Sequence, residues 1–218
     1  MSEKYKIVYS GGTGEIVEKK SRFIANVKHV RTEEEAVEFV ESIKKKYWDA
    51  THNCVAFTVG RNGEVKRSSD DGEPSGTAGR PMLEVLEGMG LHNVAVVVTR
   101  YFGGTLLGTG GLVRAYGGAV KAGLENCTIV TKCPGVKIKL ETDYTDSGKI
   151  QYIIKTMNLM DTDTQYTDRV LMEVVAAKED KKSFLNKITE ATSGRVKIKS
   201  EKEVWFADND GKCIFFDN

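Results

Sequence analysis

A strand, a glycine-rich loop and a helix follow one another in the middle of the chain, and this succession constrains the fold most. The apolar run 94–99 (VAVVVT) predicts a buried strand, and a helix is predicted over 112–125. The loop between them, residues 100–111, has the sequence RYFGGTLLGTGG. The stretch from Gly72 to Gly118 holds 12 of the 22 glycines. Glycine lets the backbone turn sharply, so the helix is expected to begin close to the end of the strand and to pack on its sheet.

The rest of the sequence predicts an α+β protein of two domains, residues 1–132 and 133–218. In the first domain, apolar spacing predicts strands at 14–19, 22–30, 53–59 and 64–68 and helices at 32–46 and 81–89. In the second, it predicts the ferredoxin-like order βαββαβ, at 136–142, 146–157, 159–166, 169–177, 180–192 and 195–204. We place the boundary near Pro134, because this proline stands between two strand-like runs. We expect the two domains to have separate cores and separate sheets.

Composition narrows the class of protein. The 32 basic and 31 acidic residues leave a net charge of +1, which argues against a protein built mainly to coat nucleic acid but leaves local basic patches open. The four cysteines form no CxxC pair, so we expect four free thiols and a cytoplasmic location. We predict no signal peptide and no membrane association, because no stretch approaches the roughly 18 apolar residues of a spanning helix. The oligomeric state stays open.

The glycine-rich loop predicts an anion site. Backbone N–H groups at a helix start attract phosphate, and an arginine at the strand end would add charge. The residues assigned to this site are Arg100, Gly103, Gly104, Gly108, Gly110, Gly111 and Arg114. The loop lacks the Gly-Lys-Ser/Thr of a P-loop and the third glycine of the dinucleotide fingerprint. The alternative is that these glycines only let the helix pack tightly on the sheet.

A second candidate site is acidic. Asp70, Asp71 and Glu73 lie in the loop 69–79, and His52 precedes a predicted strand. Clustered carboxylates can bind Mg²⁺ or act as acid and base. Acidic residues beside glycine and proline more often serve the turn itself, and this histidine has no visible nucleophile partner, so a structural role is the simpler interpretation.

Four lysines form a third candidate site, in the second domain. Lys137 and Lys139 alternate with apolar residues in the first strand of this domain, as Lys197 and Lys199 do in its last. These strands are neighbours in a ferredoxin-like sheet, so the lysines are expected to share one face. Like charges side by side are unfavourable unless an anion visits, which points to RNA or the ribosome. A solvated sheet face, with Glu173, Glu201 and Glu203 diluting the positive charge, is the simpler interpretation.

The segment 79–108 (GRPMLEVLEGMGLHNVAVVVTRYFGGTLLG) closely resembles the signature of the IMPACT/YigZ family. The segments 21–25 (SRFIA), 50–54 (ATHNC) and 70–74 (DDGEP) are also similar to that family, and the resemblance covers about residues 15–126. The remainder looks like the small C-terminal domain of bacterial members. The resemblance implies a first domain with the fold of the second domain of a small-subunit ribosomal protein, shared with domain IV of elongation factor G. It implies a second domain similar to the last domain of that factor.

The resemblance also bears on function. Eukaryotic relatives regulate translation by competing for the activator of an amino-acid-starvation kinase, whereas the family implies no established reaction for bacterial members. We therefore expect a non-enzymatic regulator of translation, without a cofactor or metal, that binds RNA, the ribosome or a translation factor. The alternative is an enzyme acting on a phosphate-bearing ligand, with Asp70, Asp71, Glu73, Arg100 and Mg²⁺.

Overall fold

The computed structural model describes residues 4–216 and divides the chain into two compact units. The first is Tyr5–Val130, and the second runs from Thr131 to the end of the described chain and takes in Lys4. Mixed helices and strands in both units confirm the predicted α+β class. Among the described residues, no helix has the length and apolar character needed to cross a membrane.

The first unit is built on a five-stranded antiparallel sheet with β7 at its centre. The strand order is β2-β3-β7-β4-β5, formed by β2 (Gly12–Glu18), β3 (Ser21–His29), β7 (Val94–Tyr101), β4 (His52–Val59) and β5 (Val65–Ser69). Residues 94–98 are all buried, because helices cover both faces of this strand. The apolar run that predicted a buried strand therefore occupies the middle of the sheet.

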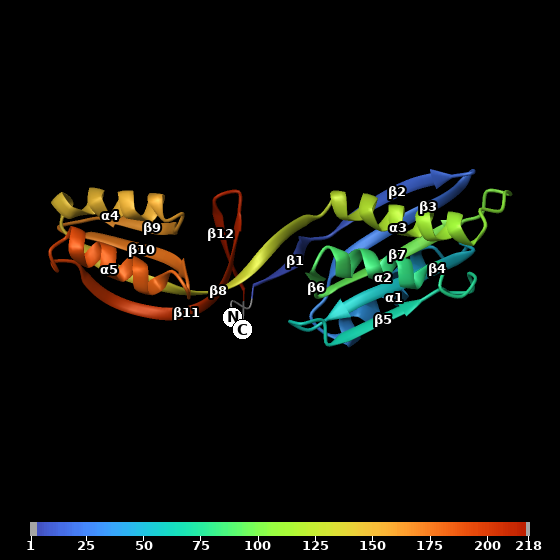
Figure 1. Cartoon of the computed structure of the whole chain (residues 1–218), viewed down its shortest axis with the longest axis horizontal. Coiled ribbons are helices and arrows are strands. Elements are labelled where there is room, and N and C mark those ends of the chain that lie inside the picture. The colour runs from blue at the N-terminus through green and yellow to red at the C-terminus, as the bar shows by residue number, and fades with distance from the viewer. Residues whose placement is uncertain (1–3, 217–218) are drawn as a thin grey trace. The chain divides into compact units, whose positions relative to one another are not determined.

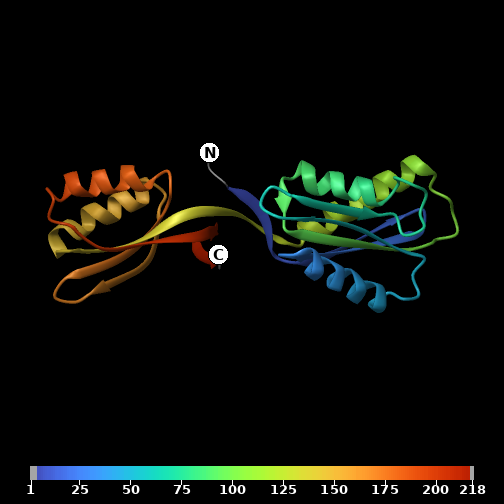
Figure 2. The ribbon, with the colours of Figure 1, turned by 90° about the horizontal axis from the view of Figure 1, so that it is seen from below.

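Three helices cover this sheet (Figure 2). Helix α1 (Glu33–Lys46) lies on one face, and α2 (Gly79–Gly88) and α3 (Thr109–Glu125) lie on the other. Helix α3 begins three residues earlier than predicted, because Gly110 and Gly111 belong to its first turn. Two short strands were not predicted: β1 (Tyr5–Ser10) and β6 (Leu91–His92) pair in parallel.

The second unit has the predicted ferredoxin-like order, followed by one additional strand (Figure 1). Its elements are β8 (Thr128–Thr142), α4 (Tyr144–Thr156), β9 (Met160–Tyr166), β10 (Val170–Ala177), α5 (Lys181–Ala191), β11 (Lys197–Asn209) and β12 (Lys212–Phe216). Both helices lie on one face of the sheet β9-β10-β8-β11, over a core of its own. The additional β12 forms a hairpin with β11.

One expectation about the boundary is wrong. Pro134 does not interrupt two strands but lies within β8, opposite Trp205 of β11, and its carbonyl oxygen accepts a hydrogen bond from Lys178 N at 3.1 Å. Proline fits a strand where its missing N–H is not needed for the ladder. The hydrogen-bonded strand order also continues from β8 to β1 and β6, so the expectation of separate sheets is wrong, although the hydrophobic clusters are separate.

Candidate functional site

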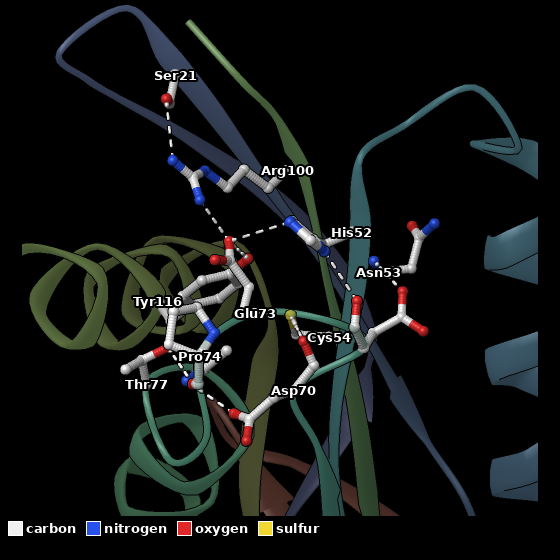
Figure 3. A network of polar contacts seen from close by, with 12 residues as sticks. Ser21, His52, Asn53, Cys54, Asp70, Glu73, Pro74, Thr77, Arg100 and Tyr116 are labelled. Carbon is white, nitrogen blue, oxygen red and sulfur yellow. Dashed lines mark hydrogen bonds and ion pairs between the residues drawn. The ribbon is translucent and has the colours of Figure 1, made fainter. Parts of the chain in front are cut away.

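Arg100 of the segment 79–108 and Glu73 of the segment 70–74, here called the signature residues, form a buried ion pair (Figure 3). Arg100 is the next-to-last residue of β7, the central strand of the sheet, and its side chain points to the face covered by α2 and α3. Glu73 comes from the loop between β5 and α2. Arg100 Nη1 lies 2.5 Å from Glu73 Oε1, and the two residues are only 5% and 8% exposed. This pair joins the sheet to the acidic loop.

Glu73 has two further neighbours. The buried hydroxyl of Tyr116, from α3, donates to Glu73 Oε1 at 2.8 Å. Burial and the neighbouring Cys54 and Glu73 raise the pKa of Tyr116, so the phenol keeps its proton and acts as a donor. His52 Nε2 lies 3.9 Å from the same carboxylate oxygen. Glu73 therefore bonds to a residue of the sheet, Arg100, and to a residue of helix α3, Tyr116.

His52 is oriented by the backbone of the acidic loop. Its Nδ1 lies 2.8 Å from the carbonyl oxygen of Asp71. A carbonyl oxygen only accepts, so Nδ1 carries the proton and donates. The imidazole therefore links the start of β4 to the loop.

The other two carboxylates of this loop also serve the fold. Asp70 caps α2: its Oδ1 accepts from Ala78 N at 3.0 Å and Gly79 N at 2.8 Å, and its Oδ2 accepts from Gly76 N at 2.8 Å. Burial alone would raise the pKa of Asp70, but the three N–H donors outweigh it and lower the pKa below its ordinary value. Asp71 accepts from Asn53 N at 2.7 Å. Each carboxylate thus has donors within the chain.

These contacts correct the assignment of the acidic loop to metal binding or acid–base chemistry. Asp70, Asp71 and Glu73 point to different partners and do not converge on one point. Within residues 4–216, no three His, Cys, Asp or Glu side chains gather as they would around a metal ion. The turn-chemistry interpretation of the acidic residues accounts for Asp70 and Asp71.

The predicted anion site with Arg100 as its cation is wrong. The guanidinium lies 5.3 Å from the ring centre of Phe23 and 5.5 Å from that of Phe102, and its Nη2 is 3.5 Å from Ser21 Oγ. Glu73 already neutralises the arginine, and burial keeps it from solvent. A second anion would have to displace this carboxylate, so Arg100 has a structural role.

The glycines of the loop differ in how strictly the structure requires them. Some are required by the backbone: a Cβ on Gly103 would lie 2.1 Å from the carbonyl carbon of Lys20, and Gly104 and Gly108 have φ of 84° and 74°. Gly110 differs, because the nearest atom to a Cβ there would be Arg114 Nη1, at 3.7 Å. Gly111 is intermediate, with Leu107 Cβ at 3.0 Å. Anion binding by this helix start stays a prediction, as does a role for the exposed Arg114.

The four lysines of the second unit are brought together, but each has an acidic partner. Glu173 of β10 pairs with Lys137 and, at 3.3 Å, with Lys139. Glu141 of β8 pairs with Lys199 at 3.0 Å and with Lys197 at 3.7 Å. The hydrogen bond from Lys199, together with the charges of the neighbouring lysines, lowers the pKa of Glu141. The face is therefore partly neutralised, and its binding of an anion stays a prediction.

The sequence did not single out three residues of the buried network: Tyr116, Ser21 and Cys54. Tyr116 is a polar-tipped residue on the buried side of α3, and Ser21 Oγ accepts from Gly103 N at 3.1 Å. Cys54 Sγ donates to Asp70 O at 3.0 Å, and burial raises the pKa of the Cys54 thiol to about 12. Ser21 and Cys54 lie in segments that resemble the family, and this resemblance could have marked them as site residues. No feature of the sequence pointed to Tyr116.

All four cysteines are free thiols, as predicted.

Comparisons with known proteins cover both units. The Impact N-terminal domain model matches residues 19–124, and a domain of unknown function, DUF1949, matches 140–195. IMPACT family member YvyE of Bacillus subtilis is 43% identical over 199 residues, covering 91% of this chain and 92% of that protein. IMPACT family member YigZ of Escherichia coli is 37% identical over 187 residues, covering 85% and 92%.

A solved structure described as that of a hypothetical protein is also similar. It is 36% identical, with a TM-score of 0.58, and the match covers 91% of this chain and 97% of that one. The buried network lies within the part matched by the Impact N-terminal domain, and the relatives are matched over nearly their whole length. The chain therefore belongs to the IMPACT family.

Proposed function

We propose that this chain regulates translation by binding RNA, the ribosome or a translation-associated factor, and that it acts in the cytoplasm without catalysing a reaction. Family membership supports the link to translation, because the eukaryotic relatives that the sequence resembles are regulators of translation. Support for binding over catalysis comes from the signature residues themselves.

One observation carries this preference: the charged groups Arg100, Glu73 and Asp70 each bond to other groups of the chain. Arg100 and Tyr116 both contact Glu73, and Asp70 accepts three backbone hydrogen bonds. A general acid or base must reach a proton of its substrate, and an electrophilic arginine must reach the developing charge. Groups that are buried in contact with one another are suited to fixing the loops of the domain. We therefore expect partners to bind to the exposed surface.

The test is an affinity capture from native lysate, with and without RNase, combined with a cell-free translation assay of the purified chain. We expect ribosomal RNA, ribosomal proteins or a translation factor to be enriched, and reporter synthesis to change with the dose of the chain. Loss of the captured material after RNase treatment would indicate RNA, and its retention would indicate a protein factor. A chain that enriches none of these and leaves reporter synthesis unchanged would contradict the proposal.

The lysine face can be tested in the same assay with a matched pair of variants. Lys139→Gln with Lys199→Gln removes two charges from the sheet face, where the two side chains are 61% and 52% exposed. Lys155→Gln with Lys187→Gln removes two exposed charges from helices α4 and α5 of the same unit. Weaker capture by the first variant alone would assign the contact to the sheet face. Equal capture by both would mean that this face is only solvated.

A further inference from the structure

The turn between β2 and β3 has an unexpected composition. Glu18 and Ser21 are paired, so the two-residue turn consists of Lys19 and Lys20, with φ of 45° and 66°. Turns with positive φ at both central positions strongly prefer Asn-Gly, because a side chain is unfavourable there. Both lysines are exposed, so packing does not account for them. Strained residues that packing does not require are candidates for a role in function.

This turn lies beside the glycine-rich loop. Gly103 N donates to Ser21 Oγ at 3.1 Å, and Gly103 is so close to the backbone of Lys20 that no side chain would fit between them. The loop then exposes two apolar side chains, Phe102 at 48% and Leu106 at 81%. The turn and the loop come together at one end of the first unit in both views (Figures 1 and 2).

A third loop, between α1 and β4, belongs to the same end. Asp49 Oδ1 accepts from Tyr101 OH at 2.8 Å, which ties this loop to the end of β7. Trp48 precedes Asp49 and is 82% exposed. An indole is among the best surfaces on which a nucleobase can stack. All three loops therefore lie at the same end of the sheet, and Phe102 directly precedes Gly103, which contacts the backbone of Lys20.

Charge at this end favours an anionic partner. Lys19, Lys20 and Lys45 form no ion pair with any residue that the structure describes, and Lys46 lies over the ring of Tyr47 at 4.8 Å. Most nearby carboxylates are engaged: Glu15 pairs with Arg22, Asp71 with Lys44, and Asp49 with Tyr101. Glu18, beside the turn, and Glu41, one helical turn before Lys45, are exposed acids. Free positive charge therefore exceeds free negative charge.

We propose that this loop end binds single-stranded RNA, which rests on the proposed function and gives it a site. Bases stack on Trp48 and Phe102, and the ammonium groups of Lys19 and Lys20 contact the phosphates. Separate rings on loops suit unpaired bases, which can turn outward to stack, whereas the bases of a duplex are already stacked on one another. Cationic side chains interleaved with aromatic rings are typical of such surfaces.

The test uses a 15-nucleotide oligo(U) and the fluorescence of the chain. There are two tryptophans, Trp48 and the buried Trp205, so stacking on Trp48 is expected to quench the exposed emission. Trp48→Phe should remove most of this quenching. A double-stranded RNA of the same length should bind more weakly. Saturating oligo(U) that leaves the emission of the native chain unchanged would overturn the proposal.

A turn variant separates function from folding. Lys19→Asn with Lys20→Gly installs the residues that the turn prefers, so the melting temperature should rise. The same change should weaken oligo(U) binding about tenfold and reduce its salt dependence by about 1.4 in the log–log slope, since each phosphate contact contributes about 0.7. Lys155→Gln with Lys187→Gln makes the same charge change on the second unit and should leave binding as it is. Unaltered binding by the turn variant would refute the site.

The outcomes also distinguish this site from the broader function. Capture of ribosomes or factors without any oligo(U) binding would sink the RNA site but leave the regulatory function standing. RNase-resistant capture that depends on Lys19 and Lys20, in a chain that does not bind oligo(U), would assign the same surface to a protein partner and contradict RNA binding. Oligo(U) binding that requires the turn lysines and Trp48 supports the site, whatever the capture experiment returns.

Discussion

Each unit contains a glutamate that holds more than one partner, and the cationic partners of the two glutamates differ in burial. In the first unit, Glu73 contacts Arg100 and Tyr116 inside the protein, where all three residues are buried. In the second, Glu173 contacts Lys137 and Lys139 on the sheet face, where the Lys139 side chain is 61% exposed. A buried charge depends on its partner, because water cannot replace it, whereas an exposed lysine exchanges its partner for water at little cost. Glutamate–cation pairs that look alike in sequence therefore have different roles. In the first unit the pair stabilises the fold, whereas in the second the lysine charge stays accessible to solvent.

The largest expected effect is the loss of the buried arginine. Arg100→Ala leaves the Glu73 carboxylate buried without its cation, which should lower the free energy of unfolding by about 3–5 kcal/mol. Urea denaturation followed by circular dichroism measures this. Arg22→Ala is the control: its pair with Glu15 is exposed, so the loss should be much smaller than that of Arg100→Ala. Equal losses in the two variants would break the comparison.

Removing the charge of the helix cap should have an intermediate effect. Asp70→Asn keeps one acceptor but places an amide donor near an N–H group of Gly76, Ala78 or Gly79, so stability at neutral pH should fall by about 1–3 kcal/mol. The folded-state pKa of Asp70 is lowered, so its contribution exists above the unfolded pKa of about 3.9 and is lost as pH falls through the folded value. The difference between the native chain and the variant should therefore shrink below about pH 4. A difference that stays constant down to pH 2 would exclude the charged cap as its cause.

The smallest expected effect comes from the lysine face. Lys139→Ala should change the free energy of unfolding by less than about 1 kcal/mol, because its pair with Glu173 is solvated and Lys137 remains. The change should diminish further in 1 M salt, where screening acts over about 3 Å. Thermal denaturation at low and high salt measures both. A loss as large as that of Arg100→Ala would show that the two glutamates are equivalent after all.

Local pattern predicted much of the fold and less of the site. Periodicity located the strands and helices, because side-chain spacing reports which face is buried. It missed β12 and misjudged Pro134, because pairing with a neighbouring strand decides whether a segment is extended. Whether a charged residue is buried depends on contacts distant in sequence. Arg100 and Glu73 are separated by 27 positions, and Tyr116 and Glu73 by 43, so loop composition alone favoured exposed roles for both ions.

The central claim is that the charged signature residues stabilise the fold by binding one another. A double-mutant cycle with Arg100→Met and Glu73→Gln tests it most directly, since the free energies of unfolding of the native chain, both single variants and the double variant give the coupling. Each single variant leaves one buried polar partner behind, whereas the double variant removes both charges. We expect a coupling of about 2–3 kcal/mol and a double variant more stable than Arg100→Met alone. Additive losses, with coupling below about 0.5 kcal/mol, would mean that the two side chains act independently and would contradict this account.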